Sequence, residues 1–261
     1  MSGHGGMDDG PDGANCATAE IFVDAIARLE LDPTTSYATR CEGIRCFVHP
    51  HGREGSPFTH EFFPHDVPAN EAMCIARAIT GGAPHLIFPM GERVHGDTAE
   101  YVAAGYTHTT GWTVMTRTLG PTLVQPGDAR VRAITDAETE SRVLHGVLPD
   151  GGTGHPLRGG LVGDSTIRQC WVEDKGDPAA FGRIVILGTA AYLGDVATAP
   201  AYRRRGHAAA ITRRLLNDAA KAGATTCVLV STAMALGLYR SFGFKELMPV
   251  LEFRSPGVGG N

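Results

Sequence analysis

A basic turn in the C-terminal half has the residue types best suited to binding a diphosphate. The turn reads Arg203, Arg204, Arg205, Gly206, His207, Ala208. The segment that follows has apolar residues at helical spacing, so the turn opens a predicted helix. The first N–H groups of a helix lack partners within it and lie at the positive end of its dipole. A glycine there lets a ligand approach the backbone, and three arginines raise the local potential, which together favour an anion site. The turn contains neither G-K-[ST] nor G-x-G-x-x-G, which excludes a Walker loop and a dinucleotide fingerprint.

The elements around the turn are predicted to form a βαβ unit. An apolar strand over 190–198 precedes the turn, a helix runs from Ala208 to about Lys221, and a buried strand covers 225–230. A second, shorter helix carries Leu236, Leu238 and Tyr239. In such a unit the two strands are parallel neighbours, so the turn lies where the first strand ends.

Two sequence blocks resemble the GNAT acyltransferase superfamily. R-x-x-G-x-A at Arg203, Gly206 and Ala208 resembles the [QR]-x-x-G-x-[GA] signature, and V-A-T-x-P precedes it. A-x-x-L-Y-x-x-x-G-F follows from Ala235 to Phe244. The resemblance covers about residues 129–254 and implies that acetyl-CoA, or another acyl-CoA, binds by its diphosphate at the turn. It implies no metal.

The resemblance also implies roles for single residues. Tyr239 matches the tyrosine that gives its proton to the coenzyme A sulfur, although an aromatic at this helix position could equally be core. A backbone N–H around Val196, Ala197 and Thr198, on a strand that splays from its neighbour, would meet the developing oxyanion. Thr232 stands where many members have an asparagine that contacts pantetheine. The anion site would comprise Arg203, Arg204, Arg205, Gly206, His207 and Ala208; Arg203 and Arg205 could instead be solvated, and His207 is expected to be a spacer.

The general base is not evident in the sequence. An amine of pKa about 10.4 is protonated at neutral pH and must lose a proton before it can attack a thioester. Many family members have a glutamate on the strand before the turn, but the matching position here is Tyr192. Asp195 is the candidate base, and it could equally face solvent. A water chain, or an acceptor amine of low pKa, would need no base.

The N-terminal half repeats the order of elements of the C-terminal half. A helix over 69–79, a strand over 86–88, a short helix and Tyr101-x-x-x-Gly105-Tyr106 parallel the C-terminal series. The segment that corresponds to the basic turn, 63–70, reads FPHDVPAN, which is unsuited to a diphosphate. We therefore expect an α/β (α+β) protein with two GNAT-like lobes, each a mixed central sheet flanked by helices, the first lobe being degenerate. An unrelated α/β domain is the alternative for that lobe.

Composition sets the remaining expectations. The chain has 261 residues and a net charge of −5, which argues against nucleic acid as a partner. No apolar run approaches the roughly 18 residues of a membrane span. Six scattered cysteines without C-x-x-C favour a cytoplasmic protein. The expected division is a disordered tail over 1–15, a degenerate lobe over 16–120, a linker over 121–128 and a GNAT domain over 129–261. Histidines 49, 51, 60 and 65 fit no standard zinc spacing.

Two functions fit these observations. The first is an N-acetyltransferase that moves an acetyl group from acetyl-CoA to an amine of a small molecule or peptide by direct attack. The second is a non-catalytic acyl-CoA-binding or regulatory protein on the same fold, which the missing carboxylate and Thr232 favour. The acceptor, the acyl chain length and the oligomeric state, including a homodimer, are left open.

Overall fold

The computed structural model describes residues 11–51, 56–120, 128–148 and 158–256. Its first half contains α1 (Pro11–Glu30), β1 (Tyr37–Cys41), β2 (Ile44–Val48), β3 (His60–Phe63), α2 (Ala69–Thr80), β4 (His85–Ile87), α3 (Val94–Ala103) and β5 (Thr107–Thr118). Its second half contains β6 (Val131–Ala133), α4 (Ala137–Val147), β7 (Ile167–Asp174), β8 (Asp177–Leu187), β9 (Ala190–Thr198), η2 (Pro200–Tyr202), α5 (His207–Lys221), β10 (Thr226–Ser231), α6 (Leu236–Ser241) and β11 (Lys245–Arg254). The mixed α/β fold class is as predicted.

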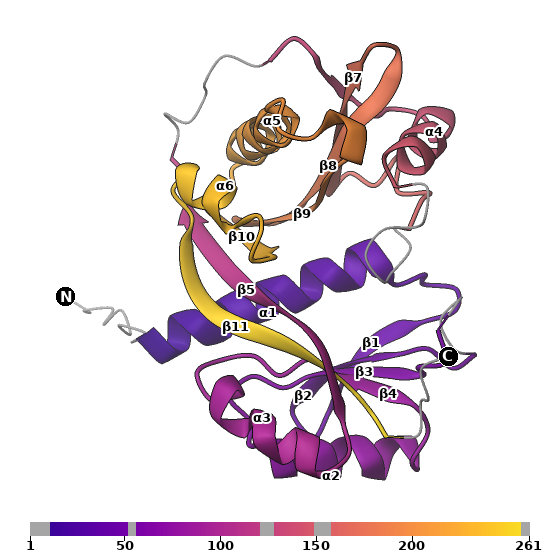
Figure 1. Ribbon diagram of the computed structural model, residues 1–261, viewed down its shortest axis with the longest axis vertical. Helices are drawn as coiled ribbons and strands as arrows, with labels where there is room; N and C mark the ends of the chain where they lie inside the picture. Colours follow the sequence, from indigo (N-terminus) through magenta and orange to yellow (C-terminus); the bar gives the residue numbers. More distant parts are fainter. Residues whose placement is uncertain (1–10, 52–55, 121–127, 149–157, 257–261) are drawn as a thin grey trace, which may run out of the picture.

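The strands form one twisted sheet through both lobes (Figure 1). Their order is β1-β2-β3-β4-β11-β5-β10-β9-β8-β7-β6. Two of the neighbouring pairs are parallel, β3 with β4 and β9 with β10, and in each a helix crosses from one strand to the next. The series β3-α2-β4-α3-β5 in the first lobe therefore matches β9-α5-β10-α6-β11 in the second, which is the internal repeat that the sequence indicated.

The lobes exchange their last strands. β5, the final strand of the first lobe, pairs with β10 of the second, and β11, the final strand of the second lobe, pairs with β4 of the first. The two exchanged strands also pair with each other from Lys245↔Thr116 to Arg254↔Thr107. Each lobe thus supplies a strand that completes the sheet of the other.

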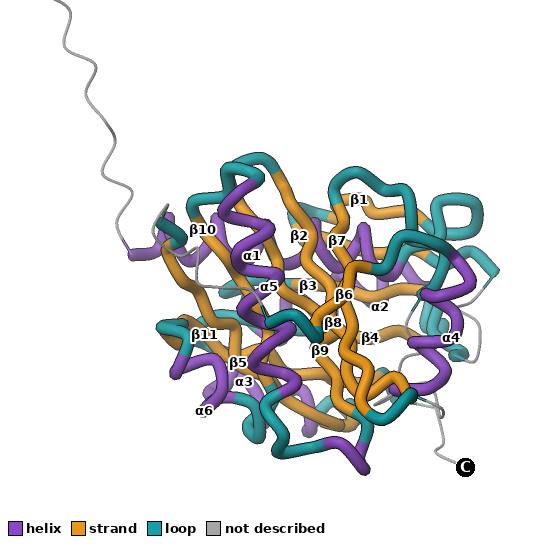
Figure 2. The backbone as a smooth tube through the Cα atoms, turned by 90° about the horizontal axis from the view of Figure 1, so that it is seen from above, coloured by secondary structure: helices purple, strands orange, loops and turns teal. Residues whose placement is uncertain are grey.

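Helices cover both faces of the sheet (Figure 2). α1 lies between the lobes, where its Phe22, Val23 and Leu29 share an apolar cluster with Phe63 of the first lobe and Tyr192 of the second. α5 and α6 pack on the opposite face of the second lobe, and α2 and α3 do so on the first. α4 covers its own small cluster with Trp171 and Phe181.

The structure differs from the sequence predictions at the start of α1 and at two strands. Residues 11–15 were expected to belong to a disordered tail, but α1 begins at Pro11. Proline is tolerated in the first turn of a helix, and the alanines at 14, 17 and 19 favour helix strongly. β1 and β3 were not predicted. Residues 1–10, most of the linker (121–127) and part of the Gly-rich segment (149–157) lie outside the described residues, and the domain boundaries remain predictions.

Candidate active site at the splayed strands

The parallel pair β9 and β10 separates near the middle of β9. Their register runs from Thr226↔Ala190 to Leu229↔Leu193 and ends there, while β9 continues to Thr198 paired only with β8. A bulge accompanies the separation, because the β8–β9 register shifts between Phe181 and Arg183. Such a bulge bends the strand and re-aims its side chains. The gap lies where the sequence predicted a splayed strand at Val196, Ala197 and Thr198.

Thr198 turns its backbone toward the gap. The N–H of Ala199 donates to the carbonyl of Ala179, on the β8 side. Since successive residues of a strand point their backbone groups to alternate sides, the N–H of Thr198 faces away from β8. The Thr198 carbonyl, on the same side, accepts a hydrogen bond from Nε of Arg203 at 3.3 Å. The N–H of Thr198 is therefore available to a ligand in the gap.

The basic turn at the start of α5 contains two residues with a left-handed backbone. Arg204 and Gly206 both have positive φ, +61° and +81°. Gly206 is the N-cap residue of α5 and makes no side-chain cap, and a Cβ built there meets no heavy atom within 4 Å. The N–H groups of the first turn of α5 therefore receive no side-chain cap from Gly206, and the space next to Gly206 is open to a ligand.

The turn is fixed by a carboxylate that the sequence did not single out. Oδ2 of Asp174, at the end of β7, lies 3.0 Å from an Arg205 guanidinium nitrogen and 3.1 Å from Nε2 of His207. Burial acts to raise the pKa of the Asp174 carboxyl, but the bonds from Arg205 and His207 outweigh it and hold the pKa below its usual value. His207 is buried, so it anchors the turn to the β7–β8 hairpin, in keeping with a structural role.

Tyr239 reaches this region from α6. Its side chain is 6% exposed, belongs to the apolar cluster under α5, and packs edge-on against Phe244. Burial, with smaller contributions from Cys227 and from the negative charge of Asp195, raises the pKa of Tyr239 to about 12. The phenol is therefore protonated at neutral pH and available as a hydrogen-bond donor.

Asp195 lies at the bulge with a left-handed backbone, φ +54°. Its Oδ2 is 3.2 Å from a guanidinium nitrogen of Arg183, which is fully buried. Burial raises the pKa of the Asp195 carboxyl above its usual value, and Arg183 opposes that rise. The charge of the Asp195 carboxylate contributes to the raised pKa of Tyr239, and its Oδ2 already accepts a hydrogen bond from Arg183.

A buried polar network holds Arg183 in place. Its guanidinium donates to Oε1 of Gln169 at 2.8 Å and to the carbonyl of Arg158 at 2.6 Å. Glu140 of α4 lies 3.7 Å from it and accepts from Gln169 and from the backbone N–H of Gly160. Sequence reasoning missed Arg183 and Glu140. A single arginine among apolar strand residues was the only signal.

The structure shows the surroundings of Tyr192 and Thr232, the two positions at which the sequence departs from the family pattern. Tyr192, which stands where many family members have a glutamate, packs against Phe22 of α1 with ring centroids 5.9 Å apart, and burial raises its pKa well above the usual value. It is a core residue and no base. Thr232 is exposed just after β10, and its carbonyl accepts from Ala235 N–H.

The equivalent region of the first lobe is closed. The pairing of β3 with β4 is continued by Phe88, Met90 and Asp66, whose N–H groups donate to Phe62, Pro64 and Met90. Before α2, Pro68 removes an N–H group, and a Cβ on Gly91 would meet the Asp66 carboxylate at 2.2 Å. A filled, acidic turn without a gap does not suit a diphosphate.

Within the described ranges, no three His, Cys, Asp or Glu side chains gather as a metal site would require. No helix among those residues has the length and apolarity needed to cross a membrane.

Comparison with known proteins agrees with this geometry. The acetyltransferase (GNAT) domain family matches residues 166–246, so this segment belongs to the GNAT superfamily, as the two sequence blocks predicted. The sequence matches no curated protein.

Solved structures with the same fold extend over both lobes. A GCN5-related N-acetyltransferase from Kribbella flavida has a TM-score of 0.64 at 17% identity, over 93% of this chain and 96% of its own. A putative GNAT acetyltransferase from Novosphingobium aromaticivorans has a TM-score of 0.55 at 18% identity, and the match covers 84% of this chain and 91% of that protein. A tandem GNAT protein from the clavulanic acid biosynthesis pathway has a TM-score of 0.51 at 11% identity, and the match covers 98% of this chain and 97% of that protein. These likenesses extend the GNAT fold to the two-lobed molecule.

Proposed function

We propose that the protein is an acyl-CoA-dependent N-acetyltransferase that moves an acetyl group from acetyl-CoA to an amine of a small molecule or peptide by direct attack. The observation that carries the proposal is the gap between β9 and β10, which lies beside an uncapped helix N-terminus in the second lobe. The corresponding gap is filled in the first lobe. One site per chain is therefore expected.

The residues around the gap suit the steps of acyl transfer. The N–H groups of Gly206, His207 and Ala208 would bind the diphosphate, and the backbone N–H of Thr198 would donate to the carbonyl oxygen as its charge grows. The amine nitrogen forms a bond to the acetyl carbon, the carbon–sulfur bond breaks, the sulfur gains a proton, and the nitrogen loses one. Tyr239 would donate toward the sulfur, and Asp195, at the bulge beside the gap, would take a proton from the amine.

A second candidate function is acyl-CoA binding without transfer. Two observations favour it: Tyr192 is buried core in the position of the usual base, and Asp195 is paired with Arg183. A thiol-release assay with acetyl-CoA over a broad amine library separates the two functions. Binding without release for any amine would support the second and contradict the first.

Tyr239→Phe is the variant that tests the mechanism. We expect a fall in rate of about 10²–10³, the usual effect of removing one preorganised hydrogen-bond donor to developing charge, with little change in acetyl-CoA affinity, because the ring and its packing remain. Since the pKa of Tyr239 is about 12, the wild-type rate should not decline through loss of this proton below about pH 11. Rate–pH profiles of both proteins check this. An unchanged rate in the variant would remove Tyr239 from the mechanism.

A further inference from the structure

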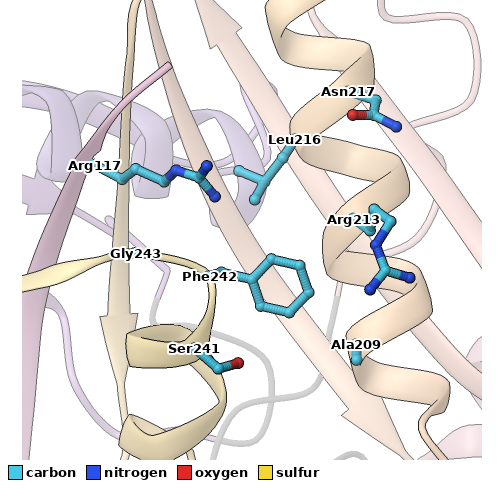
Figure 3. Close-up of a pocket in the computed structure, with 8 residues that line it drawn as sticks. All are labelled: Arg117, Ala209, Arg213, Leu216, Asn217, Ser241, Phe242 and Gly243. Atoms are coloured by element: carbon cyan, nitrogen blue, oxygen red, sulfur yellow. The ribbon is translucent and has the colours of Figure 1, made fainter. Parts of the chain in front are cut away.

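Cavities open on both faces of the sheet. One of about 440 Å³ lies between α5 and α6 beside the basic turn, and Arg117 from the exchanged strand β5 contributes to its lining (Figure 3). Another of about 720 Å³ lies between the lobes, where it is lined by the end of α1, the start of β1 and residues of the segment 158–164. The acyl-transfer steps described above use no residue of this interlobe cavity. Its volume is typical of a site for a small molecule.

Ser36 lines the interlobe cavity and contacts a histidine behind it. Its Oγ lies 2.8 Å from Nδ1 of His49. The other ring nitrogen of His49, Nε2, lies 3.3 Å from Oε1 of Glu61. A hydroxyl, an imidazole and a carboxylate therefore follow one another, beginning at the cavity. This is the order of a nucleophile, its base and the group that orients the base.

The pairing of three neighbouring strands brings these residues together. Ser36 precedes β1 and His49 follows β2, directly beyond the last pair of their ladder, so the two residues stand opposite each other. Glu61 of β3 pairs with Phe47, two residues before His49. Alternate residues of a strand share a face, so His49 and Glu61 lie on the face of Phe47, which belongs to the apolar cluster beneath α1.

The burial of His49 and Glu61 favours a role beyond fastening a loop. Their side chains are only 3% and 4% exposed, and a carboxylate in such a place costs free energy. A hydrogen bond that only fastened Ser36 would need no carboxylate behind the imidazole. Among the described residues Nε2 has no aligned hydrogen-bond partner, so the contact with Glu61 acts through charge. That charge favours the tautomer with its proton on Nε2, which leaves Nδ1 to accept the Ser36 hydroxyl.

The open edge of β1 offers a donor to a developing oxyanion. β1 is the outermost strand of the sheet, next to β2. The two-residue turn that joins them is closed by the pair Cys41↔Ile44. The closing pair of such a hairpin is hydrogen-bonded, and hydrogen-bonded pairs alternate with non-hydrogen-bonded pairs along the ladder. Ala38 therefore directs its N–H to the open edge, and it lines the same cavity as Ser36.

We propose that Ser36, His49 and Glu61 form a second catalytic site, which hydrolyses a carboxylic ester bound in the interlobe cavity. Ser36 Oγ bonds to the carbonyl carbon while its proton passes to Nδ1 of His49. The bond from that carbon to the alcohol oxygen then breaks, and the alcohol leaves with the proton. Water attacks the acyl group and gives a proton to His49; the carboxylic acid departs, and the proton returns to Ser36. Glu61 stays ionised throughout and is a positioning residue.

The lining of the cavity restricts the ester. Leucines 31, 161 and 187 provide apolar surface, which suits an acyl chain of a few carbons. Arginines outnumber aspartates among the lining residues, with 28, 45 and 158 against 24 and 164, which disfavours a cationic alcohol. The inference is independent of the proposed function, because the acetyl-CoA site shares none of these residues.

A fluorophosphonate probe, which labels activated serines, tests the proposal on the full chain. Mass spectrometry should locate the label at Ser36, and Ser36→Ala should abolish it. His49→Asn should slow the labelling by about 10²–10⁴, the usual contribution of a general base. Ser56→Ala is the matched control and should be labelled like the wild type, because the Ser56 Oγ accepts from the N–H of Phe58 in its own turn.

Hydrolysis of p-nitrophenyl butyrate examines Glu61. Glu61→Gln should lower kcat with little change in KM or melting temperature, and Glu61→Asp should retain part of the rate. An unchanged kcat in Glu61→Gln would remove Glu61 from the site.

The possible results separate this inference from the proposed function. A wild-type protein without label at Ser36 would overturn the inference, as would equal labelling rates in the wild type and a folded His49→Asn. Ser36→Ala should bind acetyl-CoA as tightly as the wild type does. Loss of that binding would indicate a structural role for Ser36 and would also overturn the inference.

Discussion

Tyr239 and Asp195 approach the gap in the sheet with unequal capacities for proton transfer. A phenol with a pKa of about 12 is a weaker acid than a thiol of pKa about 8.5, so complete transfer to a departing thiolate is uphill by about 5 kcal/mol. Tyr239 is therefore suited to donate a hydrogen bond to developing negative charge, and solvent can supply the proton afterwards. Asp195, which is ion-paired, is suited to an amine that already has a low pKa.

Gly206→Glu tests the anion site at the level of one residue. The new carboxylate would stand over the uncapped N–H groups and repel the diphosphate, so we expect acetyl-CoA binding to be lost while the protein still folds. Gly223→Glu is the matched control, since Gly223 has φ +93° at the other end of α5 and shares the backbone strain. Calorimetry with acetyl-CoA compares the two. Unchanged affinity in Gly206→Glu would mean that the diphosphate binds elsewhere.

Arg183→Met tests the buried network. Removal of the guanidinium leaves Asp195 and Glu140 without their cation, so we expect a loss of about 3–5 kcal/mol in the free energy of unfolding. Arg132→Met, which breaks the exposed pair with Glu173, should cost about 1 kcal/mol or less. Urea unfolding at pH 7 measures both.

The pH dependence of that loss has a definite sign. Burial raises the pKa of Asp195 in the folded protein, and without Arg183 nothing in that pair opposes the rise. When the pKa of a carboxyl is higher in the folded protein than in the unfolded chain, its ionisation destabilises the fold. This loss of stability is complete at a pH above the folded-state pKa and is absent at a pH below the unfolded-state pKa. The stability difference between Arg183→Met and the wild type should therefore shrink between pH 7 and pH 4. A constant difference would argue against an uncompensated carboxylate.

At the scale of elements, close packing of α5 on β8 sets the position of the basic turn. A Cβ on Gly182 would lie 2.5 Å from Cγ2 of Ile211 in α5 and 3.3 Å from Cγ2 of Val196 at the bulge. The absence of a side chain at 182 thus lets the helix approach the strands next to the gap. The turn, the helix and the bulge behave as one packed unit.

Gly182→Ala should disturb this unit. We expect a loss of about 1–3 kcal/mol in stability from overpacking, together with weaker acetyl-CoA binding, because α5 must shift. Gly237→Ala on α6 is the control: a Cβ there meets nothing within 4 Å, so stability should stay the same or rise by up to about 1 kcal/mol. Thermal unfolding and calorimetry report the two effects. Unaltered stability in Gly182→Ala would show that the contact relaxes without cost.

At the scale of the whole molecule, the exchanged strands make the lobes dependent on one another. Without β5, the edge of β10 would be exposed, and without β11 the first lobe would lose the strand beside β4. An unpaired edge is prone to aggregate. The lobes are therefore expected to fold as one structure.

A protease site inserted between residues 121 and 127 tests this dependence. After cleavage, the two pieces should elute together in gel filtration and retain acetyl-CoA binding, because β5 stays paired with β10 and β11, and β11 stays paired with β4. Either piece expressed alone should be insoluble or unfolded. Two soluble, separately folded pieces would contradict the prediction.

The sequence alone determined the local features of the second lobe. The basic turn, its helix and the strand before it follow from spacing and residue type, which act over a few neighbouring residues. The closed turn of the first lobe followed from its prolines and aspartate in the same way. The two strands missed, β1 and β3, are short and lack a clear alternation.

Only the tertiary structure decided which distant residues meet. The pairing of Asp195 with Arg183, the anchoring of the turn by Asp174 and the entry of Arg117 into the second lobe all join residues that come from different strands or lobes. Such contacts depend on strand order and register, which local spacing does not encode. The exchange of β5 and β11 is the clearest case, because either strand would satisfy the same pattern of buried residues in its own lobe.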